Sequence, residues 1–149
     1  MLAGGMLLTG CFKEKSIELK PEPETPEHPW RFEVGTQAYS GSVDVIRIDS
    51  VGGAAMLTVS GVDAAGKGRI ALQVVAIDLA PGTYQAPSVS FVYTEDANPV
   101  YQSDGSAGNF SITLSTVNEN EVVGTFSGTI QSTDSSTATL SNGSFSGIR

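Results

Sequence analysis

The stretch FSITLS at residues 110–115 and the stretch VVGTFSGTI at residues 122–130 decide the fold class. In the first stretch, apolar and hydroxyl side chains alternate strictly. In the second, Val122, Phe126 and Ile130 share one face, and the other face carries Val123, Thr125, Ser127 and Thr129. Successive side chains of a β-strand point to opposite faces, so this alternation predicts half-buried strands.

Other parts of the chain extend the β pattern. Leu57 and Val59 flank Thr58 in the same alternating way, and residues 70–79 are almost continuously apolar. We expect residues 70–79 to form a central strand covered on both faces. Turn residues such as Pro81-Gly82 separate these runs at intervals of about ten residues, and no long segment has helical spacing.

These patterns predict an all-β, antiparallel domain of about seven to nine strands. A β-sandwich is the favoured architecture, because the patterns do not show the wide cavity that a lipid-carrying barrel needs. A closed antiparallel β-barrel filled with side chains is the alternative.

Two short segments near the C-terminus almost repeat each other. They are GTFSG at residues 124–128 and GSFSG at residues 143–147. We expect them to lie on neighbouring antiparallel strands, each placing its Phe in the core and using Gly where backbones bend or approach closely.

The composition limits the partners that the protein can bind. The chain of 149 residues has 8 Lys and Arg against 16 Asp and Glu, which gives a net charge of −8. Nucleic-acid binding depends on clustered Lys and Arg, and the sequence has no basic patch. Nucleic acid is therefore not expected as a partner.

Residues 1–10 form a short apolar run that ends in Leu8-Thr9-Gly10-Cys11. The run is too short to span a bilayer and has the character of a signal-peptide core, although no Lys or Arg precedes it. We therefore expect the true start to lie upstream or to have been trimmed. The alternative is that residues 1–8 are a buried strand or helix and that Cys11 is a core thiol.

The four residues from Leu8 to Cys11 resemble the lipobox of bacterial lipoproteins. The resemblance implies that Cys11 receives diacylglycerol, that the peptide is cut before it, and that the new amine is acylated, for example with palmitate. Two or three acyl chains would form a stable membrane anchor. Cys11 is the only cysteine, so no disulfide within the chain competes for it.

Residues 11–30 are predicted to be a tether, and residues 31–149 the β domain. Four prolines between residues 21 and 29 alternate with glutamates, a composition typical of an extended spacer. Phe12 follows Cys11 where an Asp would retain an enterobacterial lipoprotein in the inner membrane. By that resemblance we expect the outer membrane of the cell envelope, with surface or periplasmic display left open.

The β domain also carries a weaker family resemblance. Its signatures are Tyr39-Ser40-Gly41, Pro81-Gly82-Thr83-Tyr84, the segment 124–128 and Asn142-Gly143-Ser144-Phe145. In this order they resemble small Bacteroidetes lipoproteins of unknown function. The resemblance implies an envelope-facing role and supplies no catalytic residues.

The residues available for catalysis are few. The only histidine, His28, lies in the predicted tether, so Ser-His and Cys-His catalysis and His- or Cys-based metal sites are not expected in the domain. A carboxylate-dependent glycoside hydrolase is the surviving enzyme alternative. Its candidate carboxylates are those in or beside strands: Glu33, Asp44, Asp78 and Glu95. A Ser-Lys dyad would need Lys67, which lies in a predicted hairpin turn.

The sequence predicts one long loop, residues 94–108, which is a candidate for a calcium site and for a ligand-binding site. Its oxygen-bearing side chains are candidates for a calcium site, with Glu95, Asp96, Asn98 and Asp104 as ligands, although the spacing matches no EF-hand. No other cofactor is expected. Tyr93 and Tyr101 are candidate contacts to a ligand, because exposed tyrosines often contact sugars or proteins; otherwise they cap the end of the sandwich.

The sequence therefore predicts a non-enzymatic, lipid-anchored envelope protein that binds a protein or glycan through loops at one end. The alternatives are the glycoside hydrolase and a structural subunit of a surface assembly. An exposed apolar patch or an unpaired strand edge would favour the structural subunit.

Overall fold

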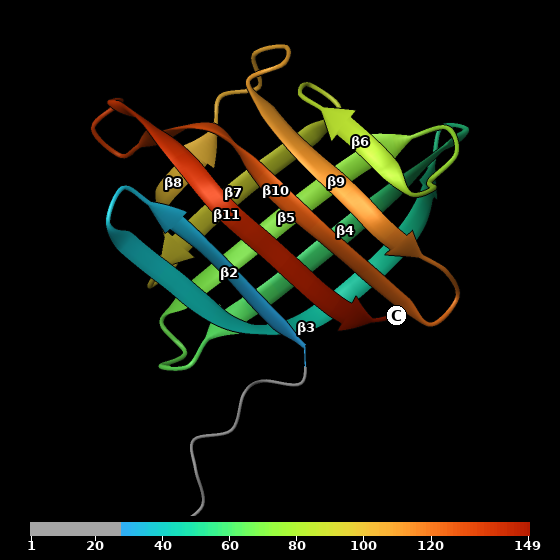
Figure 1. The fold of residues 1–149 in the computed structure, drawn as a ribbon, viewed down its shortest axis with the longest axis horizontal. Helices are drawn as coiled ribbons and strands as arrows, with labels where there is room; N and C mark the ends of the chain where they lie inside the picture. Colours follow the sequence, from blue (N-terminus) through green and yellow to red (C-terminus); the bar gives the residue numbers. More distant parts are fainter. Residues whose placement is uncertain (1–27) are drawn as a thin grey trace, which may run out of the picture.

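The computed structural model describes residues 28–149, which form antiparallel β-strands without any helix in that range. Ten strands are joined mostly by tight turns (Figure 1). Their bounds are β2 (Pro29–Val34), β3 (Gln37–Val51), β4 (Ala54–Asp63), β5 (Gly68–Ala76), β6 (Gly82–Gln85), β7 (Val89–Glu95), β8 (Asn98–Ser103), β9 (Phe110–Val117), β10 (Glu121–Ser132) and β11 (Thr137–Ile148).

The sheet closes on itself to form a barrel. Eight strands complete the circle in the order β2-β3-β4-β5-β7-β8-β10-β11, because β11 pairs with both β10 and β2. β9 lies beside the first half of β10, and β6 lies beside β9. In Figure 1, β11, β10, β9 and β6 cross the front of the barrel, and β4, β5 and β7 form the back.

The all-β antiparallel class is confirmed, and of the two predicted architectures the structure has the closed barrel rather than the sandwich. The barrel is of the predicted side-chain-filled kind, because aromatic rings fill its interior. Phe32 contacts Phe91, Tyr93 and Phe126 at ring-centroid distances of 5.3, 5.5 and 6.2 Å. No polar or charged residue is buried among the residues described.

The strand predictions are confirmed at the positions that alternate. Phe110, Ile112 and Leu114 are at most 1% exposed, and Val122, Phe126 and Ile130 at most 3%. The prediction that residues 70–79 are covered on both faces is wrong. Only the inward side chains of β5 are buried; Val75 is 41% exposed, and Ile77, just beyond the strand, is 81% exposed. A strand in a barrel wall has one face toward solvent, even when its sequence is apolar.

The near-repeat is confirmed as a pair of antiparallel neighbours with matched packing. Gly124 on β10 pairs with Phe145 on β11, and Phe126 pairs with Gly143. A Cβ at Gly124 would lie 2.9 Å from the Phe145 ring, and one at Gly143 would lie 2.6 Å from the Phe126 ring. Each Phe thus occupies the space above the Gly of the opposite strand.

The domain begins two residues before the predicted boundary. Pro29 and Trp30 belong to β2, and Trp30 is fully buried. A Cβ at Gly41 or Gly61 would lie within 3 Å of its indole, so both positions must be small. The Trp30 indole N–H has no hydrogen-bond partner among residues 28–149. Within residues 28–149, no helix is long and apolar enough to cross a membrane.

Candidate functional site

Three tyrosines meet inside one end of the barrel. Tyr39 lies near the start of β3, Tyr93 near the end of β7 and Tyr101 on β8. The Tyr39 and Tyr101 hydroxyls hydrogen-bond at 2.8 Å, and the Tyr93 hydroxyl donates to Glu95 at 3.1 Å. The β2–β3, β4–β5, β7–β8 and β10–β11 turns surround this end, which we call the tyrosine end (Figure 1).

The tyrosine cluster is protected from ionisation. Burial and then the hydrogen bond with Tyr101 raise the pKa of Tyr39 well above its ordinary value. Burial and then the bond to Glu95 do the same for the pKa of Tyr93. Both phenols therefore stay neutral at any physiological pH.

Tyr93 is a core residue, so its predicted role as an exposed ligand contact does not fit the structure. It is 1% exposed and packs against Trp30 and Phe32. Tyr101 is half-buried and keeps one side open to solvent. Only Tyr101 of the two predicted tyrosines is therefore placed to touch a ligand.

The predicted long loop does not exist as such. Residues 94–98 form a tight β7–β8 hairpin, and Asp96 and Ala97 at its tip have φ angles of 51° and 67°. β8 then occupies residues 98–103. This strand separates Asp104 from Glu95, Asp96 and Asn98, so the four candidate calcium ligands do not converge. No group of three or more His, Cys, Asp or Glu within residues 28–149 is arranged to hold a metal ion.

The candidate glycosidase carboxylates are also dispersed. Glu33 bonds to Arg31 at 2.6 Å on β2, and Asp44 bonds to Arg69 at 3.0 Å on the outer face of β3 and β5. Asp78 is exposed in the β5–β6 connection at the opposite end of the barrel from Glu95. Glu33 and Asp44 are thus held by arginines on the outer face, and Asp78 and Glu95 lie at opposite ends of the barrel.

Lys67 lies in the β4–β5 turn, as the sequence predicts. Its ammonium is 3.9 Å from Asp96, and both side chains are about two-thirds exposed.

A hollow opens in the barrel wall beside the tyrosine end. β10 pairs with β9 as far as Gly128 and then joins β8 from Ile130 to Ser132. β8 continues beyond this last pair, so residues 98–100 have no partner on the β10 side within the described sheet. The β10–β11 turn bends past them and leaves the gap open. We call this gap the seam hollow.

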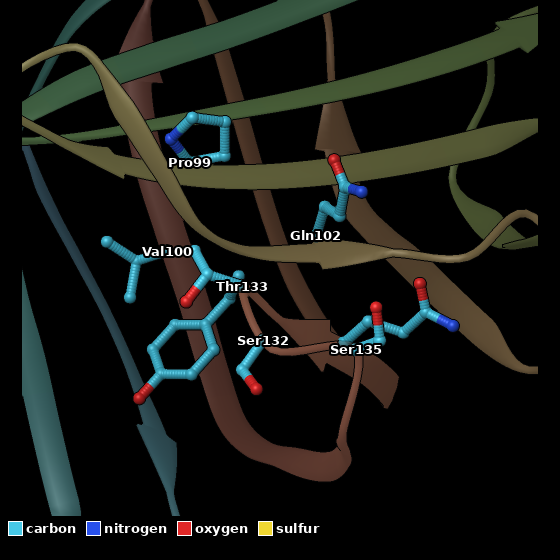
Figure 2. A pocket seen from close by; sticks show the side chains of 8 residues that line it. Pro99, Val100, Gln102, Ser132, Thr133 and Ser135 are labelled. Carbon is cyan, nitrogen blue, oxygen red and sulfur yellow. The ribbon is translucent and has the colours of Figure 1, made fainter.

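The seam hollow has a volume of about 290 Å³ and an uncharged lining. Figure 2 shows Pro99, Val100 and Gln102 of β8 on one side; on the other are Ser132, the last residue of β10, and Thr133 and Ser135 of the β10–β11 turn. Tyr101 and Gln131 complete the lining. Gln102 and Gln131 are register partners on adjacent strands.

The turn that borders the hollow is internally braced. The Ser132 and Ser136 hydroxyls each donate to the Asp134 carboxylate at 2.6 Å, and the Ser136 amide donates to it at 3.0 Å. These bonds lower the pKa of Asp134 to about 2. The carboxylate is thus committed to the turn and does not line the hollow.

The sequence predicted one residue of this site, Tyr101, and missed the rest. Gln102 lies in the predicted loop, and Gln131, Ser132, Thr133 and Ser135 belong to a distant segment that reads as an ordinary strand and turn. No local signal links the two segments, because only the change of partner along β10 brings them together.

Comparison with known proteins gives no match, whether to protein-family models, to curated proteins or to solved structures. The seam hollow and the tyrosine end therefore have to be interpreted from their own chemistry.

Proposed function

We propose that this chain is a non-enzymatic lipoprotein of the cell envelope, anchored through Cys11, whose barrel binds a protein or glycan partner at the tyrosine end. The proposed anchor and the predicted signal peptide lie outside the described residues, and the lipobox resemblance supports them. The outer membrane is the proposed location.

The seam hollow is the observation that carries the binding function. It combines a half-buried tyrosine with amide and hydroxyl groups in a concave site, the mixture typical of ligand pockets. The dispersed carboxylates favour binding over glycoside hydrolysis, which needs two carboxyl groups about 5–10 Å apart across the scissile bond.

Two variants test the two halves of this proposal. Cys11→Ser, expressed from the complete gene in the native host, should move the protein from the membrane fraction to the soluble fraction. Persistence in the membrane fraction would refute the lipid anchor. Mass spectrometry of the native protein should find diacylglycerol on the Cys11 sulfur.

The binding half is tested with Thr133→Arg, which places a long charged side chain at the rim of the hollow. Wild-type protein is presented to a glycan array and, separately, to a detergent extract of host envelope proteins. A partner bound by the wild type should be lost with Thr133→Arg and kept with Gln73→Ala, an exposed substitution on the outer face of β5. If the wild type binds nothing in either assay, the binding function is refuted while the anchor stands.

A structural subunit of a larger assembly is the second candidate, because the barrel has an exposed apolar patch. Ile77 is 81% exposed, Val51 53% and Val75 41%. Val75 is paired with Met56 and Val51 with Ala54, so Val75 and Val51 lie on the two sides of β4, and Ile77 directly follows β5. Self-association that is removed by Ile77→Asp in sedimentation experiments would support this function. A monomer at every concentration would count against self-assembly.

A further inference from the structure

One edge of the barrel wall has no partner strand and is complementary to itself. We propose that the protein forms a two-fold symmetric dimer in which residues 45–51 of β3 pair antiparallel with the same residues of a second copy. This inference rests on the second candidate function, self-association, for which it specifies the interface. It is independent of the seam hollow.

β3 is much longer than the strand beside it (Figure 1). β3 has 15 residues and β2 has 6, and their pairing ends at Pro29 and Ser42. From Val45 to Val51, β3 pairs with β4 on one side, and no strand within residues 28–149 pairs with it on the other. An edge of this kind exposes N–H and C=O groups that a strand of another chain can bind.

The free edge at residues 45–51 lacks the usual protection against such pairing. Edge strands are commonly shielded by proline, lysine, an inward-pointing charge or a short length. Residues 45–51 contain neither proline nor lysine, and the charged side chains of Arg47 and Asp49 are exposed and bond to each other at 2.7 Å. By contrast, β6 has only four residues, and the unpaired end of β8 contains Pro99.

The backbone of this edge is oriented for pairing. The inward-facing Val43 donates its amide to the His28 carbonyl at 2.7 Å, so inward-facing residues of β3 direct their N–H and C=O groups toward the β2 side. An irregularity after Val43 shifts the alternation by one residue, and Ile46 and Ile48 then pack inward. Residues on one face of a strand direct their polar groups to the same edge. Ile46, Ile48 and Ser50 therefore present theirs to the free edge.

The sequence VIRIDSV of residues 45–51 is chemically symmetric about its centre, Ile48. In an antiparallel pair centred on Ile48, Arg47 of each copy lies directly opposite Asp49 of the other. Opposite charges in directly facing positions stabilise a strand pair, and like charges destabilise it. Moving the centre by one residue would place Arg47 opposite Arg47 or Asp49 opposite Asp49. The charges therefore favour one register.

The ends of the edge match in the same register. Val45 is 40% exposed and Val51 is 53% exposed, and each would lie opposite the other residue in the second copy. Pairing would cover apolar surface that a single copy leaves in water, and this burial favours association. Because the edge itself complements both the charges and the apolar ends, a second copy fits it better than an unrelated chain does.

Sedimentation velocity of the complete chain tests the proposal. Every protein carries Cys11→Ser, which removes the only cysteine and with it both lipidation and chance disulfides. We expect a monomer–dimer equilibrium. Arg47→Asp and Asp49→Arg should each weaken it by at least about tenfold, because like charges then face each other twice. An equal mixture of these two variants should restore the dimer, because opposite charges face each other again.

The matched control is Arg69→Asp, which makes the same change of charge at an exposed arginine on β5, two strands away from the edge. It should dimerise as the wild type does. Tryptophan fluorescence reports whether each variant is folded.

Engineered cysteines test the register. When Arg47→Cys protein is mixed with Asp49→Cys protein and oxidised, a disulfide should join the two copies, because directly opposite Cα atoms lie about 4.5–5.5 Å apart. Neither variant alone should cross-link efficiently, because its two cysteines would be diagonal neighbours about 7–8 Å apart.

Four outcomes would overturn the inference. A wild type that stays monomeric at every concentration would remove both the interface and the self-association on which it rests. A dimer that Ile77→Asp abolishes and Arg47→Asp does not would remove the interface and leave self-association standing. A dimer in which the mixed cysteine variants fail to cross-link would have another register. Cross-linking of Asp49→Cys protein to a different envelope protein in the host would assign the edge to another partner.

Discussion

A single methyl group at Gly61 should measurably destabilise the barrel. Gly61 lies on β4 beneath the Trp30 indole, next to the β3 backbone. A Cβ there would lie 2.3 Å from the Ser42 carbonyl oxygen and 2.7 Å from the indole Nε1 and Cδ1. Ordinary contacts between non-bonded carbon atoms are about 3.5–4.0 Å, so Gly61→Ala requires a shift of roughly 1 Å.

The size of the stability loss depends on whether the Trp30 indole and the Ser42 carbonyl can move, and neither can move easily. Trp30 is fully buried, and a Cβ at Gly41 would meet the same indole at its Cζ2 atom, at 2.8 Å. The Ser42 carbonyl belongs to the backbone of β3. Overpacking in a tight core costs about 1–3 kcal/mol, and the rigid surroundings place Gly61→Ala near the upper value. Because small domains are stable by about 5–15 kcal/mol, the variant should still fold.

Urea denaturation followed by tryptophan fluorescence measures this effect directly, because Trp30 is the only tryptophan in the chain. With an m-value of about 1–3 kcal/mol/M, a loss of about 3 kcal/mol should lower the midpoint by about 1–3 M at unchanged slope. The control is Ser60→Ala, at the residue that precedes Gly61 on β4 and points outward. It should change stability by less than about 0.5 kcal/mol. A midpoint for Gly61→Ala within about 0.3 M of the wild type would refute the packing argument.

Three other predictions follow from local geometry and charge. Ala97→Gly should stabilise the protein by about 0.5–1 kcal/mol, because Ala97 has a φ of 67° that glycine adopts without a Cβ clash; a lower melting temperature would contradict this. Because the pKa values of Tyr39 and Tyr93 are raised, both phenols stay protonated in the folded protein above pH of about 10, where they ionise in the unfolded chain. Urea midpoints should therefore fall as pH rises past 10, and a constant midpoint up to pH 12 would contradict the burial of these phenols. The carboxyl carbon of Asp134 should titrate in NMR spectra with a pKa of about 2, so its stabilising effect is present above pH of about 4 and is lost as the pH falls toward 2. A midpoint near 4 would show that the turn is not braced in solution.

The fold class was predictable because each strand carries its own alternation, whereas closure into a barrel was not. The same inward and outward pattern serves a sandwich or a barrel, and the choice depends on whether β11 pairs with β2. That pairing joins the two ends of the domain and leaves no local mark. Residues 29 and 30 were included in the tether because of the proline-rich composition of residues 21–29, yet proline is tolerated at the first residue of a strand.

The site was less predictable than the fold, and the β7–β8 hairpin shows why. Its tip has positive φ angles at Asp96 and Ala97, a geometry for which Asn-Gly or Asp-Gly is the usual sequence signal. Asp-Ala gives no such signal, so residues 94–108 were interpreted as one long loop. That error placed Tyr93 in a loop and grouped Asp104 with residues that lie at the other end of β8.

The position of the seam hollow relative to the N-terminal entry of the chain supports a role in binding. β2 leads from Pro29, where the predicted tether joins the barrel, to Val34 beside the tyrosine end. At about 3.3 Å per residue, the six residues of β2 place the entry point roughly 20 Å from the turn that follows. If the tether leads to a membrane through Cys11, the hollow is therefore separated from the point of attachment by the length of a strand. A tethered barrel with its concave, uncharged site at that distance can meet a ligand outside the lipid surface, which is the geometry that a binding lipoprotein needs.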